Sequence, residues 1–354
     1  MRVKFADTLK IINGKNQQKV EDPQGKYPIY GSGGIMGYAN DYICPAETVI
    51  IGRKGSINKP IFADTPFWNV DTAFGLCADK AKLFPKYLYY FCVNFDFECL
   101  NTTVTIPSLT KSNLLNIEIP LPPLDEQRRI AAVLDKVSDL IAKRREQMNK
   151  LDELVKARFV EMFSDIKRED TLINLCNFID YRGKTPEKTD HGLPFITAKN
   201  VKMHYMSFDT QEFISKETYD RVMTRGIPRE GDVVFTTEAP LGNVCRIPHI
   251  GTEFYIGQRI ITMQAKWIRP EYLEYALSSD KFVKKIAGKS SGSTVTGIRS
   301  KLLEQLTIPV PPLSLQEQFA VFTKETDKLK LTIQHSLDKM ETLKKALMQE
   351  YFGM

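Results

Sequence analysis

A glycine-rich stretch is the first place in the chain where residue types and spacing suit binding chemistry. Four glycines fall within the seven residues 31–37, and glycine lets a backbone approach a partner closely and adopt positive φ. A dinucleotide-binding loop is not indicated, because no strand-then-helix context follows and Pro45 interrupts the pattern. The candidate contact residues in this stretch are Tyr30, Gly31, Ser32, Gly33, Gly34 and Tyr38.

A basic turn follows the apolar run 49–51, which is predicted to be a buried strand. Arg53 and Lys54 open this turn, Asn58 follows them, and Trp68 and Asn69 lie in a second apolar stretch. Arginine and lysine bind phosphate or a guanine edge, and asparagine binds an adenine edge, so contact with a nucleic acid is one interpretation. The competing interpretations are a solvated hairpin turn for the polar residues and a core position for the tryptophan.

A second group of basic and polar residues lies between positions 180 and 294. A basic turn occupies 180–186, a strand over 193–196 ends in hydrogen-bonding side chains, and a small polar loop covers 287–294. Gly288-Lys289-Ser290 resembles the tail of a P-loop, but Val283 stands where that motif requires glycine, so we reject a P-loop. The candidate nucleic-acid contacts in this group are Tyr181, Arg182, Gly183, Lys184, Lys199, Asn200, Arg259, Ser291, Ser293 and Thr294.

Signatures of catalysis and metal binding are missing from the sequence. The six cysteines form no CxxC pair, and the four histidines are scattered. The two Pro-Pro pairs read Leu-Pro-Pro-Leu and Val-Pro-Pro-Leu, and so lack the Asn or Asp and the aromatic of the adenine-methyltransferase tetrapeptide. We therefore expect no catalytic residue, no metal site and no cofactor of the chain's own.

A repeat at an offset of 189 residues supplies the elements that must position these segments. Residues 108–163 align with 297–352 without a gap, so that Gln127 corresponds to Gln316. Each copy runs from an Ile-Pro-x-Pro-Pro-Leu segment into a long helical pattern. The preceding segments, 1–107 and 164–296, do not resemble each other. A repeated segment that follows two dissimilar segments suggests that the two dissimilar segments recognise different things.

The two helical patterns are predicted to form a coiled coil. Apolar residues recur at spacings of three and four from Ile130 to Met162 and from Phe319 to Tyr351, with Arg144 interrupting the first series. About 39 residues at about 1.5 Å each make a helix about 58 Å long. We expect the helices to pack antiparallel with a pseudo-twofold axis. The alternative is that each helix packs only on its own domain.

Length and charge set wider bounds. A chain of 354 residues suits two or three domains. The net charge of +6 falls mainly in 1–118 and 164–307, which fits a polyanionic partner without proving one. No apolar run reaches the 18 residues of a membrane span, and 1–5 lack a signal-peptide core, so a cytoplasmic protein with no membrane partner is expected.

These motifs together resemble a specificity subunit of a type I restriction–modification system, over essentially the whole chain. The Ile-Pro-x-Pro-Pro-Leu segments that lead into the helices resemble the family's spacer regions. The stretch 27–72 resembles one type of its recognition domain, and 182–186 with Gly231-Asp232 and Gly257-Gln258-Arg259 resembles another. One departure is Ser314-Leu315, where the first helix has Asp125-Glu126, so the docking surface of the second helix differs.

The resemblance implies an α+β fold: two mixed α/β target-recognition domains separated by two long antiparallel coiled-coil helices. The expected segments are target-recognition domain 1 (1–118), spacer helix 1 (119–163), target-recognition domain 2 (164–307) and spacer helix 2 (308–354). We call 1–118 the first block and 164–307 the second block. Each would read half of a split, asymmetric DNA target in the major groove, and the helices would set the gap between the halves.

The resemblance also implies partners. Two modification subunits would dock on the helices, motor-nuclease subunits would join them, and S-adenosylmethionine, ATP and Mg²⁺ would belong to those partners. The isolated subunit would have no activity, and its exposed helix surfaces could self-associate. The docking residues we expect are Gln127, Arg128, Arg144, Gln316 and Gln318.

Two rival functions remain open at this point. A self-contained DNA-modifying enzyme would act with cofactor but without a partner, and a coiled-coil assembly protein would show no salt-sensitive binding to duplex DNA. The sequence does not give the DNA target.

Overall fold

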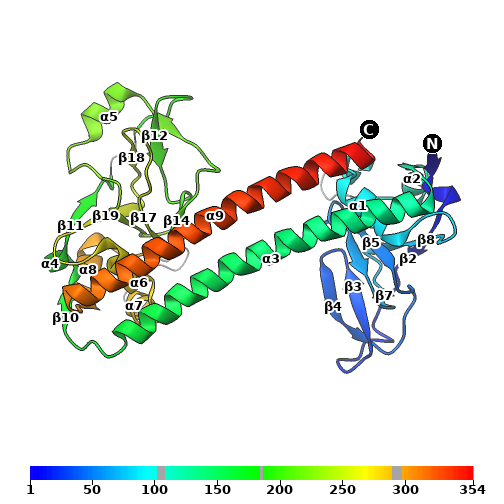
Figure 1. Cartoon of the computed structure of the whole chain (residues 1–354), viewed down its shortest axis with the longest axis horizontal. Helices are drawn as coiled ribbons and strands as arrows, with labels where there is room; N and C mark the ends of the chain where they lie inside the picture. Colours follow the sequence, from blue (N-terminus) through cyan, green and yellow to red (C-terminus); the bar gives the residue numbers. More distant parts are fainter. Residues whose placement is uncertain (102–107, 184–185, 289–296, 354) are drawn as a thin grey trace. The chain divides into compact units, whose positions relative to one another are not determined.

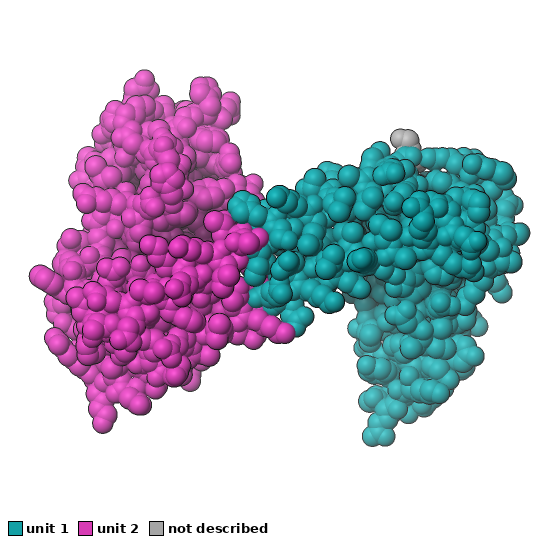
Figure 2. All heavy atoms as spheres, viewed as in Figure 1, with its two compact units in different colours: residues 1–147, 333–354 teal, residues 148–332 magenta. Residues whose placement is uncertain are grey.

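The computed structural model describes residues 1–101, 108–183, 186–288 and 297–353 of the chain. The chain divides into two compact units: unit 1 consists of 1–147 and 333–354, and unit 2 of 148–332 (Figure 2). Two 40-residue helices, α3 (Leu124–Phe163) and α9 (Leu313–Phe352), each cross from one unit into the other (Figure 1). Each unit therefore contains part of each long helix.

Among its described residues, unit 1 contains two larger sheets, a two-stranded sheet and four short helices. Its strands are β1 (Arg2–Lys4), β2 (Leu9–Asn13), β3 (Tyr27–Gly31), β4 (Gly34–Ala39), β5 (Thr48–Gly52), β6 (Ile61–Ala63), β7 (Trp68–Asn69), β8 (Ala73–Ala78) and β9 (Glu118–Pro120). Its short helices are η1 (Phe5–Asp7), α1 (Pro85–Asn94), η2 (Phe97–Leu100) and α2 (Lys111–Leu115). One sheet has the order β2-β8-β5-β6 and is antiparallel throughout, and the other has the order β4-β3-β7.

Unit 2 repeats this plan with different connections. Its strands are β10 (Glu169–Thr171), β11 (Cys176–Asp180), β12 (Leu193–Ile196), β13 (Val201–Lys202), β14 (Tyr205–Met206), β15 (Phe213–Ile214), β16 (Val233–Thr236), β17 (Val244–Arg246), β18 (Tyr255–Ile256), β19 (Ile260–Ala265) and β20 (Thr307–Pro309). Its short helices are α4 (Leu172–Leu175), α5 (Lys216–Val222), α6 (Pro270–Ser278), α7 (Asp280–Ala287) and α8 (Ser300–Glu304). The two larger sheets have the orders β11-β19-β16-β17 and β15-β12-β18.

Each proline-rich segment forms a short strand that fixes the start of a long helix. β9 pairs antiparallel with β1 in unit 1, and β20 pairs antiparallel with β10 in unit 2. Proline then stops the strand ladder because it has no N–H to donate, and the helix begins at Leu124 or Leu313. Asp125 and Glu126 lie in the first turn of α3, where negative charge favours the helix dipole.

Within each unit the start of one long helix packs on the end of the other. In unit 1, Val137 and Ile141 of α3 form an apolar cluster with Leu337 of α9, and Arg145 pairs with Glu341 at 2.6 Å. In unit 2, Phe159 of α3 packs against Phe319 of α9 at 5.5 Å between ring centroids, and Lys330 of α9 pairs with Asp152 of α3. The predicted antiparallel coiled coil is confirmed, and packing of each helix on its own domain alone is not observed.

The last aromatic residue of each long helix packs against the short helix of a block. The Phe352 ring lies 5.0 Å from Tyr87 of α1 in unit 1, and the Phe163 ring lies 4.8 Å from Tyr272 of α6 in unit 2. The two phenylalanines correspond in the repeat. Aromatic contacts at these distances contribute beyond simple area burial, so both helix ends are held firmly.

Among the described residues, no helix combines the length and the apolar character that a bilayer span requires.

Candidate nucleic-acid interface

The glycine-rich stretch forms a hairpin of β3 and β4. Ser32 and Gly33 make its turn, and Gly34 has a φ of +125°, a conformation that glycine alone adopts without strain. A Cβ added at Gly33 or Gly34 would meet open space, so the backbone of the turn is accessible. Tyr38 is 45% exposed beside Met36, which is 63% exposed. The hairpin therefore presents backbone groups and apolar side chains at its surface.

The base of the same hairpin is packed. Gly31 is buried, and the half-buried Tyr30 ring makes an edge contact with Phe67 at 5.2 Å between centroids. These two residues shape the hairpin from inside, whereas Ser32, Gly33, Gly34 and Tyr38 remain candidates for contact.

The basic turn after β5 is exposed as predicted. All five residues of β5 are buried, and Arg53 and Lys54 follow it at the surface. The Arg53 guanidinium lies 5.7 Å from the centre of the Phe74 ring, and neither cation forms an ion pair with any described residue. Their charges are therefore available to an anionic partner.

Three polar side chains near this turn have structural roles instead. The Asn58 amide donates to Asp96 Oδ1 at 2.7 Å and accepts from the Phe97 backbone N–H at 2.7 Å. Trp68 and Asn69 are 7% and 0% exposed. Trp68 Nε1 donates to the Lys15 carbonyl at 3.0 Å, and Asn69 Nδ2 donates to the Ala73 carbonyl at 3.0 Å. The two buried residues, Trp68 and Asn69, therefore leave the set of base-contact candidates, whereas Asn58 is exposed and stays a prediction.

Two predicted contacts of the second block are also buried. Tyr181 is 1% exposed, and its hydroxyl donates to the Gly226 carbonyl and accepts from the Arg225 N–H at 3.1 Å. Asn200 is 3% exposed, and its amide donates to two backbone carbonyls, at 2.8 and 3.0 Å. A side chain that is buried with its polar atoms satisfied cannot read a base in this conformation, so both residues leave the candidate set.

Arg182 remains at the surface, but its charge is compensated. Its guanidinium makes contacts of 2.7–3.1 Å with both carboxylate oxygens of Asp180. Burial opposes ionisation of Asp180, but hydrogen bonds from Arg182 outweigh it and hold the pKa of the carboxyl below its usual value. Arg225, which the sequence analysis missed, donates to the Asp180 and Arg182 carbonyls at 2.8 and 3.0 Å. The turn is rigid, and Gly183 lies exposed beside it with a φ of +80°.

Lys199 and Arg259 are exposed cations with single carboxylate neighbours. Lys199 Nζ is 3.9 Å from Glu212, and its side chain is 71% exposed. Arg259 Nε is 3.0 Å from Glu238. The remaining predicted contacts of the second block, Lys184, Ser291, Ser293 and Thr294, lie outside the described residues.

The repeated glutamines connect the long helices to the blocks and do not face a partner. Gln127 Oε1 accepts from the N–H of Phe84, the residue before α1, at 2.8 Å, and its Nε2 donates to the Lys82 and Pro122 carbonyls. Gln316 Oε1 likewise accepts from the N–H of Arg269, the residue before α6, at 2.8 Å, and its Nε2 donates to Pro311. Both side chains are at most 1% exposed. The prediction that these glutamines dock a partner was therefore wrong, although their position in both repeats could have indicated a shared structural role.

The other three predicted docking residues stay accessible. Arg128 pairs with Asp125 at 3.0 Å, and Arg144 donates to Gln147 at 2.8 Å, both within α3. Gln318 is exposed on α9.

Four leucines of the predicted helix seams are exposed instead of packed, and they form two repeat pairs. Leu140 corresponds to Leu329, and Leu154 corresponds to Leu343, by the 189-residue offset. Their exposed fractions are 40%, 56%, 50% and 51%, respectively. Unit 1 carries Leu140 and Leu343, and unit 2 carries Leu154 and Leu329. We call these four residues the paired leucines; each unit presents one from each helix.

Among the described residues no group of three or more His, Cys, Asp or Glu side chains is placed to hold a metal ion. Burial raises the pKa of the Cys44 and Cys176 thiols to about 12, so neither is a nucleophile at neutral pH.

Comparisons with known proteins fit this arrangement. The sequence profile of the type I restriction modification DNA specificity domain matches residues 1–153 and 171–344. A type I restriction enzyme specificity subunit of Methanocaldococcus jannaschii is 25% identical over 98% of this chain and 90% of its own length. A putative type I restriction enzyme specificity subunit of Haemophilus influenzae is 23% identical over 92% of this chain and 88% of its own length.

A solved structure has the same fold. The crystal structure of the S subunit of a type I restriction–modification system from M. genitalium superposes with a TM-score of 0.65 at 17% identity. The superposition covers 99% of this chain and 96% of that one.

Proposed function

The chain belongs to the type I restriction–modification DNA specificity family, and from this premise we propose that it reads a split, asymmetric DNA target. The first block, 1–118, and the second block, 164–307, would be its two target-recognition domains, each reading one half in the major groove. The observation that carries the proposal is the repeated glutamine, because it attaches two dissimilar blocks to equivalent positions on one frame. Two different blocks attached at equivalent positions of the nearly symmetric pair of long helices would suit a DNA target whose two halves differ in sequence.

The described candidates for DNA contact in the first block are the β3–β4 turn and the basic turn. Ser32, Gly33, Gly34 and Tyr38 are accessible on the hairpin. Arg53 and Lys54 are exposed, and no carboxylate of the described residues pairs with them. Backbone N–H groups and lysine suit phosphates, and arginine suits a guanine edge. In the second block we retain Arg182, Gly183, Lys199 and Arg259, together with the candidates outside the described residues.

The paired leucines support docking of two modification subunits. Large apolar side chains at equivalent exposed positions of a repeat are a sign of partner contact, since isolated exposed leucines would have no reason to recur. Each unit holds one member of each repeat pair, Leu140 with Leu343 in unit 1 and Leu154 with Leu329 in unit 2, which suits two copies of one partner. The subunit would contribute no catalytic residue, and S-adenosylmethionine, ATP and Mg²⁺ would be bound by the modification and motor-nuclease subunits.

Deleting the gene is expected to abolish one bipartite methyladenine motif in the host genome. The reason is that the modification subunits would lose the only element that directs them to that sequence. Methylome sequencing of cells that carry this gene and its modification gene, against the deletion strain, measures the effect. Restoring the gene on a plasmid is the control. An unchanged methylome, with the modification subunit present and active, would contradict the proposal.

Changing Leu140 and Leu343 together to aspartate is expected to reduce the bound modification subunits from two to one. Two buried charges at a contact centre should weaken docking at that surface by about tenfold or more. Native mass spectrometry of the purified complex gives the stoichiometry. The matched control is Leu331→Asp, because Leu331 is 59% exposed on α9 and its repeat counterpart is Ala142, so it is unpaired. Two bound subunits in the double variant would rule these leucines out.

A further inference from the structure

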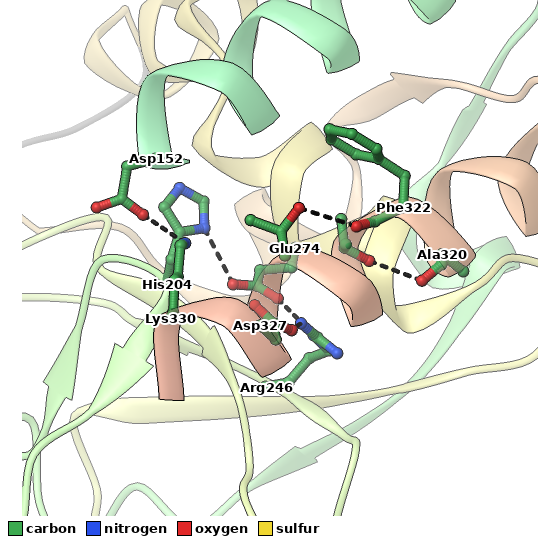
Figure 3. Close-up of polar contacts among 10 residues, drawn as sticks. Asp152, His204, Arg246, Glu274, Ala320, Phe322, Asp327 and Lys330 are labelled. Atoms are coloured by element: carbon green, nitrogen blue, oxygen red, sulfur yellow. Dashed lines mark hydrogen bonds and ion pairs between the residues drawn. The ribbon is translucent and has the colours of Figure 1, made fainter. Parts of the chain in front are cut away.

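An ion network joins the second block to α9 inside unit 2 (Figure 3). Arg246 lies at the end of β17, and its Nε donates to Glu274 of α6 at 2.6 Å while its Nη2 donates to Asp327 of α9 at 2.8 Å. His204, in the turn between β13 and β14, places Nδ1 3.0 Å from the other Glu274 oxygen. We call His204, Arg246, Glu274 and Asp327 the ion network. It joins a hairpin, a sheet edge, a short helix and a long helix.

The inner members of the ion network are buried. The side chains of Glu274 and His204 are 2% and 8% exposed, and that of Arg246 is 26% exposed. Burial alone would lower the pKa of Arg246, but the carboxylates of Glu274 and Asp327 raise it above its ordinary value, so the guanidinium stays charged. The His204 ring also stacks on Tyr275 at 4.3 Å, and its backbone N–H donates to the Val244 carbonyl at 2.8 Å. The hairpin and the sheet edge are thus fixed to each other.

Asp327 is the member that extends the network beyond the second block. Its side chain is 45% exposed, and it lies on the helix that follows that block. Unit 1 has a related but weaker connection, in which Asp135 of α3 pairs with Lys86 of α1 at 3.0 Å. There the cation comes from a short helix. When α1 and α6 are aligned at their first residues, Pro85 and Pro270, Tyr89 stands at the position of Glu274. In unit 2 the cation comes from the edge of the main sheet, so the helix is coupled directly to that sheet.

A buried ion pair adds little net stability because desolvation offsets the attraction, but its geometry is directional. A guanidinium held by two carboxylates has one preferred orientation. Because Arg246 is part of β17, the orientation of the sheet relative to α9 is restricted as well. The network is therefore better suited to fixing an angle than to raising the melting temperature.

We propose that the Arg246–Asp327 ion pair, supported by Glu274 and His204, is a positioning device that fixes the angle of the second block on α9 and so narrows the gap accepted between the two DNA half-targets. This inference rests on the proposed function. One extra base pair moves a half-target by about 3.4 Å and turns it by about 35° around the duplex. A block held at one angle cannot follow that rotation, whereas a loosened block tolerates it.

Asp327→Ala tests the positioning role because it removes the contact between the ion network and α9. Arg246, Glu274 and His204 stay in contact with one another. The probe is a plasmid pool that carries the bipartite motif found in the methylome of wild-type cells, with the native gap or a gap one base pair longer or shorter. The pool is methylated in cells that contain the complete modification complex, and the methylated fraction is read by sequencing. The expected result is a fall of about fivefold in the preference for the native gap, with the bases required in each half unchanged.

Two matched variants complete the experiment. Asp338→Ala removes the same charge from the same helix and should keep the wild-type preference for the native gap. Asp338 is exposed, and its side chain accepts a hydrogen bond from Gln334 of the same helix. Asp327→Glu retains the carboxylate and should restore most of the preference. If Asp327→Ala fails to accumulate, Asp327→Asn removes the charge of the ion pair but keeps an oxygen acceptor, so a smaller fall in the preference for the native gap is expected.

The possible failures are distinguishable. Equal loss of methylation at all three gaps would show a purely structural role and overturn the inference, as would an unchanged preference in Asp327→Ala. In both cases methylation of the native motif by the wild-type complex would leave the proposed function intact. Absence of any bipartite methylation by the wild type would overturn the function itself.

Discussion

Gln316→Ala is expected to lower the free energy of unfolding of unit 2 by about 3 kcal/mol, and Gln127→Ala to do the same to unit 1. Each change leaves buried backbone groups without partners: the Phe84 N–H and the Lys82 and Pro122 carbonyls in unit 1, and the Arg269 N–H and Pro311 carbonyl in unit 2. Unsatisfied buried groups are costly because they lose water as well as their protein partner. Chemical denaturation of the full chain, followed by circular dichroism, measures the loss.

The design includes an isosteric variant and a surface control. Gln→Glu at either position keeps the volume but removes the amide donor, so it should destabilise the same unit. Gln318→Ala, two residues after Gln316 and exposed on α9, should change the free energy of unfolding by less than about 0.5 kcal/mol. If Gln316→Ala behaved like Gln318→Ala, the glutamines would not hold the blocks to the helices.

Arg53→Ala is expected to weaken binding of the complex to its specific duplex by about thirtyfold, which corresponds to about 2 kcal/mol. The physical reason is that Arg53 carries a charge that no described carboxylate compensates, at the end of a fully buried strand. Arg182→Ala should cost less, because that guanidinium is already paired with Asp180 and its charge is partly cancelled. Fluorescence anisotropy at fixed salt, with specific and unrelated duplexes, measures both.

Arg53→Lys separates base recognition from phosphate binding. Lysine keeps the charge but lacks the two parallel donors that bind a guanine edge. If Arg53 reads a base, the lysine variant should keep its affinity for unrelated duplex and lose most of its preference for the specific one. Full specificity in Arg53→Lys would assign the residue to the backbone, and wild-type affinity in Arg53→Ala would remove it from the interface.

The frame of the molecule could be predicted from the sequence because its signals are local and occur twice. The heptad spacing and the proline-rich helix starts are contained in short windows, and the offset of 189 residues shows which parts belong together. The exposure of Arg53 and Lys54 could also be predicted, because an all-apolar strand must end at a surface if the next two residues are charged.

The wrong predictions of base-contact residues come from contacts between residues that are distant in the sequence. Trp68 donates to a carbonyl 53 residues earlier, and Tyr181 donates to one 45 residues later. Nothing near either residue indicates such a partner, so a polar aromatic beside a basic turn suggests a binding role. In the first helix the seam is occupied by Ile141 and Val155, which are buried, and not by the neighbouring Leu140 and Leu154. In the second helix the expected seam residues Leu329 and Leu343 are exposed, because the spacing identifies an apolar position but not whether the partner helix or another protein covers it.

The packing of Phe352 on Tyr87 determines which of the two units can complete its core first during translation. Residues 1–147 of unit 1 are synthesised before unit 2, yet the core of unit 1 is completed by the end of α9, with Arg2 donating to the Gly353 carbonyl at 3.1 Å. Unit 2 is a continuous stretch of the chain and can close earlier. During translation Tyr87 and Phe91 of the first block therefore stay uncovered by Phe352 until more than two hundred later residues have been synthesised. This interval is when the nascent chain is most open to aggregation and to chaperones.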